Sequence, residues 1–271
     1  MQNFLNKDLI RQRTSWRTYN GKKLSVDERE SLLSFIESDM NPLFGSNLRF
    51  KLVDRDSGSQ KMGTYGFIKD ARHFIVGAVK PGDMNIEDYG YALEKIILYA
   101  TGMGLGTCWM GGTFNKQGFL ELLSPDEGEI MPAITPVGYV NERRGTFGKA
   151  VRYFAGARNR KPWSNLFFKQ GFTPLTKEDA GVFCDALELV RLAPSASNGQ
   201  PWRVVLDGGS AHFYFKVRKG YESMNRLDMG IAFSHFDLSL KEAGITGEWE
   251  VIDSDVASSG LKYVATWNRQ A

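Results

Sequence analysis

The 271-residue sequence has only two cysteines and three histidines, and none of them lie close together in the chain. Cys108 and Cys184 form none of the short spacings that are typical of zinc or redox sites. His73, His212 and His235 are isolated, so no Ser–His–Asp triad and no metal-ligating cluster is visible. We therefore expect no bound metal, and we expect both cysteines to be buried free thiols, as in a reducing compartment.

The sequence also lacks a strong charge imbalance and a long apolar run. It has 34 basic and 31 acidic residues and a net charge of +3, which is too balanced to favour general binding to nucleic acid or membranes. No apolar run reaches the roughly 18 residues that a membrane span needs, and the stretch MQNFLNKDLIRQR has no apolar signal core. We expect a cytoplasmic protein in which any anionic ligand is held by a local group of basic residues.

The sequence does contain an internal repeat. The stretch from Gly90 to Met110 matches the stretch from Gly230 to Glu250 at a constant offset of 140 residues, and the two tryptophans of these stretches coincide. LSVDERESLL also matches LTKEDAGVFC, and ARHFIVGAVK matches SAHFYFKVRK, in the same order along the chain. Three matching elements indicate a duplication, which we divide into halves at residues 1–170 and 171–271.

Each half is predicted to form a helix, two strands, a long helix and further strands. In the first half we expect helices at 25–37 and 86–103 and strands at 48–53, 72–79, 105–110 and 133–140. In the second half we expect helices at 176–191 and 225–243 and strands at 203–207, 211–217, 246–252 and 261–267. The long helix of the first half is apolar around most of its surface, which is typical of a buried helix. These elements predict an α+β fold with antiparallel or mixed sheets and two long buried helices at its centre.

Two polar segments are candidate binding elements. RQRTSWRTY (Arg11–Tyr19), if extended, places Arg13, Ser15 and Arg17 on one face, which suits a phosphate. The alternative is a solvated basic arm. LAPSASNGQPWR (Leu192–Arg203) is a rigid polar loop between a helix and a strand, which is either a simple connection or one wall of a site.

These segments resemble motifs of the nitroreductase family. RTSWRTY is similar to the family's Arg–Arg–Ser–x–Arg–x–Phe opening, and APSASNGQPWR is similar to its Ala–Pro–Ser–x–x–Asn–x–Gln–Pro–Trp motif. ATGMGLGTCWMGG is similar to its Gly–Leu–Gly–Thr–x–Trp–x–Gly–Gly segment, although that glycine-rich stretch also suits a plain helix cap and strand. VGYVNERRG and RNRKPW resemble the family's last strand and basic tail. The resemblance covers most of the chain and implies a nitroreductase-like fold, in the single-chain tandem branch sometimes called TM nitroreductases.

The arrangement of these motifs implies an intramolecular pseudo-dimer. In ordinary nitroreductases two chains pair, and the opening of one chain faces the Pro–Ser motif of its partner across a flavin. Here the opening occurs only in the first half and the Pro–Ser motif only in the second half. At the place in the first half that is equivalent to the Pro–Ser motif, the sequence is NPLFGSN (Asn41–Asn47). The resemblance therefore implies one composite FMN site between the halves, and leaves open whether the second pseudo-site is filled or collapsed.

The resemblance assigns cofactor-binding residues from three parts of the chain. Those expected at the FMN phosphate and ribityl chain are Arg13, Thr14, Ser15, Arg17, and Arg158 or Arg160. Those expected around the isoalloxazine ring are Gly111 and Gly112 on one side and Pro194, Ser195, Ala196, Ser197, Asn198 and Gln200 on the other. Because the redox chemistry belongs to the flavin, no catalytic side chain is expected.

The function implied by the resemblance is that of an FMN-dependent oxidoreductase. It would pass hydride from NAD(P)H through FMN to a nitroaromatic, a quinone or a flavin. The alternatives are a flavin-binding module with little turnover and a different flavin chemistry on the same scaffold. We expect a monomer, because the interface of the pseudo-dimer is already internal. The acceptor and the choice between NADH and NADPH stay open.

Overall fold

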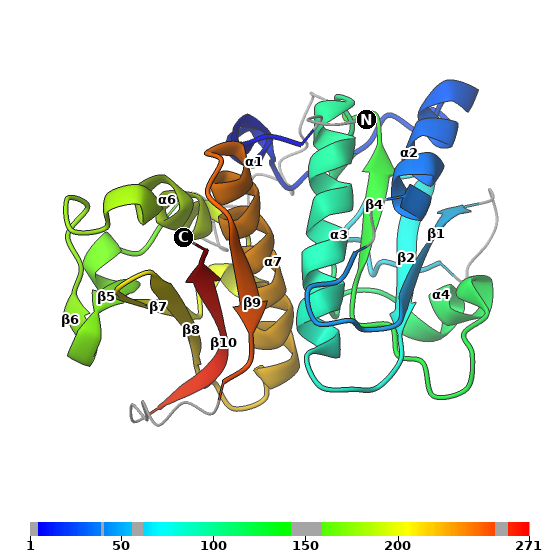
Figure 1. Cartoon of the computed structure of the whole chain (residues 1–271). Coiled ribbons are helices and arrows are strands. Elements are labelled where there is room, and N and C mark those ends of the chain that lie inside the picture. The colour runs from blue at the N-terminus through cyan, green and yellow to red at the C-terminus, as the bar shows by residue number, and fades with distance from the viewer. Residues whose placement is uncertain (1–4, 39–40, 56–61, 142–158, 253–259, 271) are drawn as a thin grey trace.

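The fold is seen in a computed structural model that describes residues 5–38, 41–55, 62–141, 159–252 and 260–270. It is built from two units that flank a central pair of helices (Figure 1). Within the described ranges, no helix has both the length and the apolar character needed to cross a membrane.

The first unit is a four-stranded antiparallel sheet with helices against it. Its strands lie in the order β1-β2-β4-β3, and every pairing is antiparallel. The strands are β1 (Leu48–Asp54), β2 (His73–Val79), β3 (Gly106–Thr107) and β4 (Ile134–Gly138). The helices against the sheet are α2 (Val26–Ser38), α3 (Asn85–Gly102) and α4 (Lys116–Leu123), whereas α1 (Lys7–Gln12) packs against α3 and the helices of the second unit.

The second unit is a six-stranded mixed sheet in the order β6-β5-β7-β8-β10-β9. Only the pairing of β5 with β7 is parallel. The strands are β5 (Phe167–Lys169), β6 (Thr173–Pro174), β7 (Trp202–Asp207), β8 (Ser210–Lys216), β9 (Gly247–Glu250) and β10 (Leu261–Arg269). The helices are α6 (Cys184–Leu192) and α7 (Glu222–Glu242), with short 3-10 turns η1 (Trp163–Asn165), η2 (Gln170–Phe172), η3 (Gly181–Phe183) and η4 (Ala196–Asn198).

The long helices α3 and α7 pack against each other at the centre of the molecule (Figure 1). Their backbones approach most closely at a pair of glycines. A Cβ atom on Gly230 would lie 2.0 Å from the Glu87 carbonyl oxygen, and one on Gly90 would lie 2.5 Å from the Leu227 carbonyl oxygen. Only glycine fits at these positions, which explains why both halves have it at the same place in the repeat.

The expected α+β pseudo-dimer is confirmed, and side-chain contacts repeat between its halves. Asn85 Nδ2 donates to the Lys80 carbonyl and Asn225 Nδ2 donates to the Lys216 carbonyl. The strands ARHFIVGAVK and SAHFYFKVRK correspond, but their register differs from the sequence match. Lys80 N donates to Asn47 O and Lys216 N donates to Pro201 O, so Lys80 is equivalent to Lys216.

Several element boundaries differ from expectation. The helix expected at 176–191 begins only at Cys184, because Gly181 has a φ of +53° and interrupts the helical backbone after Ala180. By contrast, Ser25 and Glu28 form the expected start of α2, since the Glu28 carboxylate accepts from Ser25 N and Ser25 Oγ accepts from Glu28 N. The helices α1 and α4 and the strands β5 and β6 were not expected.

The division at residues 170/171 stays a prediction. The strand β5 precedes that boundary but belongs to the six-stranded sheet of the second unit through its pairing with β7. The segment before it, from Asn159 to Lys161, also contacts the second unit, as described below. The C-terminal end of the first half therefore contributes structure to the second half.

Candidate functional site

The basic arm that follows α1 is extended and lies on the first sheet. Asn6 caps α1 by accepting from Asp8 N and Leu9 N, and the helix ends at Gln12. Beyond it, Trp16 N donates to Thr107 O at 2.8 Å, and Lys69 N donates to Arg17 O at 2.8 Å. The first bond pairs the arm with β3 and the second joins it to the segment before β2, so the alternative of a freely solvated arm is wrong for the described residues.

The Arg13 side chain is buried at the junction of the two halves. It is only 8 % exposed, and its Nε lies 3.7 Å from Glu94 Oε1 on α3, which is an ion pair but too long for a hydrogen bond. Within the described chain, Arg13 Nε and Nη1 have no hydrogen-bond partner. Buried guanidinium groups normally have their N–H groups satisfied, so this side chain can accept an anion without giving up an existing bond.

The Glu94 carboxylate beside Arg13 contacts side chains of both halves. The carboxylate is fully buried and accepts from Trp109 Nε1 at 2.6 Å. Its other oxygen lies 2.9 Å from His235 Nε2 on α7, and His235 Nδ1 lies 2.9 Å from the Leu189 carbonyl on α6. Because the carbonyl only accepts, His235 donates through Nδ1. The network fixes the position of the carboxylate beside Arg13.

The arm also acts electrostatically on a second buried group, the Cys108 thiol. Burial raises the pKa of this thiol, while Arg17, Arg13 and a hydrogen bond with Ser15 act in the opposite direction. Whether Arg13, Ser15 and Arg17 together hold a phosphate stays a prediction. Thr14 between them is half-buried.

The polar loop after α6 is held in an unusual backbone conformation. Ser197, Asn198 and Gln200 have φ angles of +53°, +52° and +46°, a region that costs free energy for residues other than glycine. Ser195 Oγ accepts from Gln200 N at 2.9 Å, which closes the loop on itself. Pro194 and Ala196 are half-buried at its start. Such strain persists only where the surroundings determine the conformation, and it is concentrated at functional sites.

The segment from Asn159 to Lys161 fastens this loop from outside. Arg160 Nη1 donates to Asn198 Oδ1 at 3.0 Å, and Arg160 Nη2 donates to the Leu192 carbonyl at 2.9 Å. Lys161 N donates to Gln200 Oε1 at 2.8 Å, and Gln200 Nε2 donates to the Asn159 carbonyl at 3.3 Å. The amides of Asn198 and Gln200 therefore hold the basic tail in this structure.

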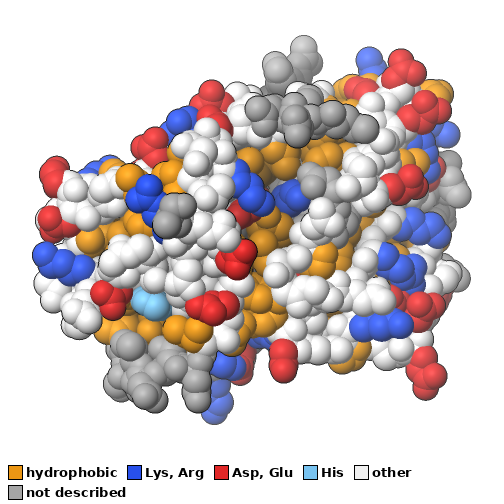
Figure 2. Space-filling model, viewed as in Figure 1, with side chains coloured by type: hydrophobic (Ala, Val, Ile, Leu, Met, Phe, Trp, Pro, Cys, Tyr) orange, Lys and Arg blue, Asp and Glu red, His pale blue; other side chains and the backbone are white. Residues whose placement is uncertain are grey.

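The charge of the arm reaches the segment that holds the loop. Burial lowers the pKa of the Arg160 guanidinium, and the charges of Arg13 and Arg191 lower it further. Arg191 is paired with Glu188 in two-pronged geometry. Figure 2 shows basic side chains among apolar ones where the two halves meet. The buried Arg13 and the half-buried Arg160 carry like charges, and like charges held near each other favour an anion between them.

Of the two adjacent glycines Gly111 and Gly112, only Gly111 lies close to the second half. A Cβ atom on Gly111 would lie 2.5 Å from the Met224 sulfur on α7, whereas the space around Gly112 is open within 4 Å. Gly111 therefore lies against the other half, as expected of a composite site, but a thioether covers it. Arg158, the alternative to Arg160 in the expected clamp, lies outside the described residues.

The loop is also anchored from below by a buried carboxylate. Asp228 on α7 accepts from Ala196 N at 3.0 and 3.1 Å, and burial raises its pKa well above the ordinary value. Its repeat equivalent Asp88 accepts from Phe44 N at 3.0 and 3.2 Å and from Ser46 N at 3.0 Å. In each half, an aspartate at the equivalent position of the long helix therefore accepts hydrogen bonds from the backbone of the loop.

Replacing each of these two aspartates by asparagine should change the stability of the protein in opposite directions at neutral pH. A carboxyl group with a raised folded-state pKa stabilises the fold below its unfolded pKa of about 3.9, and that contribution is lost as the pH rises through the folded value. The wild type should therefore lose stability relative to Asp228→Asn by up to about 1.4 kcal/mol for each pH unit in this window. Urea unfolding at pH 4 to 8 measures the difference between the two proteins.

Asp88→Asn is the matched control for this experiment. An asparagine at this position offers one acceptor, and its amide would face an N–H group, so we expect a loss of about 1–3 kcal/mol at neutral pH. A stability difference between wild type and Asp228→Asn that does not change with pH would contradict the raised pKa of the Asp228 carboxyl group.

The structure adds four residues that the sequence interpretation did not include: Glu94, Asp228, Met224 and Lys161. The repeat held a signal for one of them, because Asp88 and Asp228 stand two residues before the matched glycines at the same offset of 140. Glu94 is an acid within an apolar helix, which is also a detectable signal. Met224 and Lys161 have no such signal.

His73 and His212 form hydrogen bonds with neighbouring side chains, and neither cysteine is in a disulfide. His73 Nδ1 lies 2.7 Å from Asp54 Oδ1, and His212 Nδ1 lies 2.9 Å from Thr266 Oγ1. Both cysteines are free, but Cys184 is half-buried and not fully buried as expected. No group of three potential metal ligands occurs in the described ranges.

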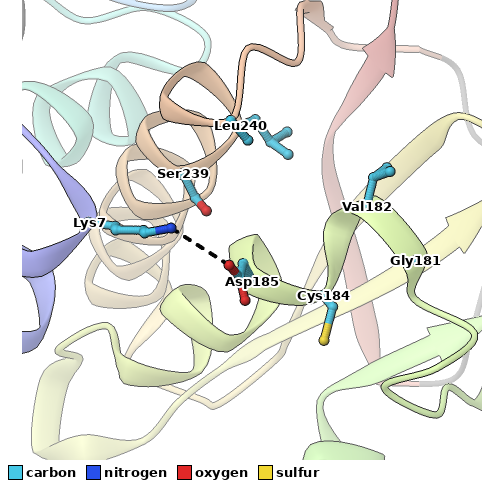
Figure 3. A pocket seen from close by; sticks show the side chains of 8 residues that line it. Lys7, Gly181, Val182, Cys184, Asp185, Ser239 and Leu240 are labelled. Carbon is cyan, nitrogen blue, oxygen red and sulfur yellow. Dashed lines mark ion pairs between the residues drawn. The ribbon is translucent and has the colours of Figure 1, made fainter.

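A surface hollow lies elsewhere on the second half. It is lined by η3, α6 and the end of α7, together with Lys7 and Asp185, which form an ion pair at 3.8 Å (Figure 3). It shares no residue with the arm, the glycine pair or the loop, so we do not assign the candidate site to it.

These features define a class of protein, a single-chain α+β pseudo-dimer with a buried arginine, Arg13, beside its central helix α3. The chain belongs to the family described as "Putative TM nitroreductase", whose model matches residues 6–240. A search of curated proteins gave no significant match.

A solved structure that is similar over nearly the whole chain shows the same fold. A Thermotoga maritima protein described as a putative nitroreductase is 21% identical, with a TM-score of 0.64, and the match covers 99% of this chain and 95% of that chain. An FMN-dependent nitroreductase of Clostridium difficile is 22% identical over 50% of this chain and 88% of that chain, with a TM-score of 0.42. A Bacteroides fragilis nitroreductase with bound FMN is 17% identical over 51% of this chain and 89% of that chain, with a TM-score of 0.41.

Proposed function

We propose that the protein is an FMN-dependent oxidoreductase that passes electrons from NAD(P)H to a small acceptor such as a nitroaromatic, a quinone or a free flavin. One observation carries the proposal. Two nitrogen atoms of the buried Arg13 side chain have no partner in the described chain, and Arg13 lies beside Glu94 on the central helix α3. A phosphate is the anion whose geometry suits a guanidinium fork.

The residues present fit FMN. Arg13, Ser15 and Arg17 would hold the phosphate, with Arg160 adding positive charge from the other side. Gly111 and the loop from Pro194 to Gln200 would approach the ring. FMN, when bound, supplies two-electron redox chemistry between a nicotinamide and an acceptor.

The chain's own part in the reaction is placement and electrostatics. Glu94, its hydrogen bond from Trp109 and its contact with His235 fix the environment of Arg13, so the guanidinium has little freedom to lose on binding. Asp228 and Lys161 fix the loop in the same way. A rigid, positively charged cradle between two apolar halves is suited to holding a cofactor while excluding water.

Arg17→Ala should weaken FMN binding by at least about tenfold, because it removes one charge-assisted contact of roughly 1.5–3 kcal/mol. FMN fluorescence titration measures the affinity. Equal affinities in wild type and variant would remove Arg17 from the phosphate site. Arg11, which is exposed and paired with Asp8, provides the control: Arg11→Ala should bind FMN like the wild type.

Turnover separates the enzyme from a flavin-binding module. The proposal predicts that the FMN-loaded protein oxidises NADH or NADPH when a quinone or nitroaromatic is present, and that the rate falls in Arg17→Ala at subsaturating FMN. Bound FMN without accelerated NAD(P)H oxidation with either nucleotide would leave the binding site standing and contradict the enzymatic proposal.

We also propose that the protein is a monomer, because α3 and α7 already bury the interface that would join two chains. Light scattering should give a mass near 30.4 kDa. A mass of twice that value, unchanged on dilution, would contradict this proposal.

A further inference from the structure

The loops 41–47 and 192–200 occupy equivalent places in the two halves. Phe44 N donates to Asp88 and Ala196 N donates to Asp228, and these aspartates stand 140 residues apart on the two central helices. The same backbone contact at the same position of the repeat makes Phe44 the structural equivalent of Ala196.

The neighbouring residues support this equivalence. Gly45 and Ser197, which follow them, are both left-handed, with φ of +78° and +53°. Asn47 and Pro201 make the same contact with the second strand of their sheets. The second loop is thus longer between the equivalent points, and its additional residues include the left-handed turn that binds the basic tail.

The side chains at these two positions differ greatly in size. The Phe44 ring packs edge-on against Phe233 of α7, with ring centroids 6.2 Å apart, and contributes to the apolar core of the second half. Ala196 offers a methyl group at the corresponding place. The first half's equivalent of Phe233 is Leu93, so neither partner of this aromatic pair is repeated at the composite site.

The polar network of the composite site is also missing from the second pseudo-site. The repeat equivalents of Glu94 and Trp109 are Ser234 and Trp249. In the described part of the chain, Ser234 Oγ and Trp249 Nε1 are buried without a hydrogen-bond partner, whereas Glu94 accepts from Trp109. The second pseudo-site therefore has a serine at the position that the Glu94 carboxylate occupies in the first.

We propose that Ala196 keeps the composite site open and that Phe44 closes its pseudosymmetric counterpart, so that each chain holds one FMN. The inference rests on the proposed function for the identity of the ligand. It assigns the difference between the two sites to one pair of equivalent positions, a small residue in one loop and a phenyl ring in the other.

The test is the number of FMN molecules retained per chain and their affinity, measured by absorbance and fluorescence titration. Wild type should bind one FMN. Ala196→Phe should lower the affinity at least about a hundredfold, because a ring at this position competes with the cofactor for the same volume. Phe44→Ala is the matched control and should keep the wild-type affinity of the composite site. Circular dichroism and thermal unfolding of the unliganded proteins establish that each variant is folded.

The outcomes separate the two proposals. Two FMN molecules in the wild type, or wild-type affinity in Ala196→Phe, would overturn the inference while the FMN site stands. Loss of FMN in Phe44→Ala would also overturn it, since Phe44 would then belong to the functional site. No binding to the wild type would overturn the proposed function itself. If Ala196→Phe does not fold, Ala196→Leu replaces it, and the wild-type stoichiometry decides independently.

Discussion

Arg13→Met should weaken FMN binding by about a hundredfold and leave riboflavin binding nearly unchanged. The Arg13 guanidinium is 8 % exposed, and two of its nitrogens have no partner within the described residues. Two charge-assisted bonds to a phosphate, each worth roughly 1.5–3 kcal/mol, correspond to a loss of this size or more. Riboflavin lacks the phosphate, so it reports any general damage to the site.

Arg13→Lys is the matched variant for this comparison. Lysine keeps the charge but not the planar fork, so its FMN affinity should fall between those of wild type and Arg13→Met. Titration of all three proteins with both ligands measures the preference for FMN over riboflavin. An equal preference in wild type and Arg13→Met would show that the phosphate binds elsewhere.

Gly230→Ala should destabilise the protein by about 3 kcal/mol or more. At an unconstrained position inside a helix the same change stabilises by about 1 kcal/mol, so the sign of the effect is diagnostic. The added Cβ would lie 2.0 Å from the Glu87 carbonyl oxygen and 2.7 Å from Tyr91 N. Both atoms belong to the backbone of α3, so only a separation of the two helices relieves the contact.

Chemical denaturation measures the effect, with Gly82→Ala as control. Gly82 has no atom within 4 Å of the added Cβ, so its substitution should change stability by less than about 0.5 kcal/mol. Unchanged or increased stability in Gly230→Ala would contradict the close crossing of α3 and α7. It would also remove the structural basis for a composite site.

Much of the fold could be predicted from the repeat, because it is expressed in strongly periodic segments. The long helices and the strands other than β5 and β6 lie close to their expected ranges. The helix α1 spans only Lys7–Gln12 and α4 only Lys116–Leu123, and segments of this length show too little periodicity to be recognised. The late start of α6 depends on the backbone of Gly181, which composition alone does not determine.

The candidate site was predicted in part, and the missing part depends on tertiary contacts. The arm and the loop were identified because each has a distinctive local sequence. Glu94 and His235 meet only because α3 and α7 cross at their glycines, and they are far apart in the chain. Asn198 and Gln200 were expected to contact the cofactor, whereas the structure shows their amides bound to the tail. Which residues contact FMN stays a prediction.

The most direct measurement is the visible absorption spectrum of the wild-type protein after mixing with FMN or riboflavin and desalting. The account predicts that FMN is retained, with flavin peaks near about 370 and 450 nm, and that riboflavin is largely removed. A protein that shows no flavin absorbance after mixing with FMN and desalting would contradict a site built around the buried Arg13. Equal retention of riboflavin and FMN would contradict it as well.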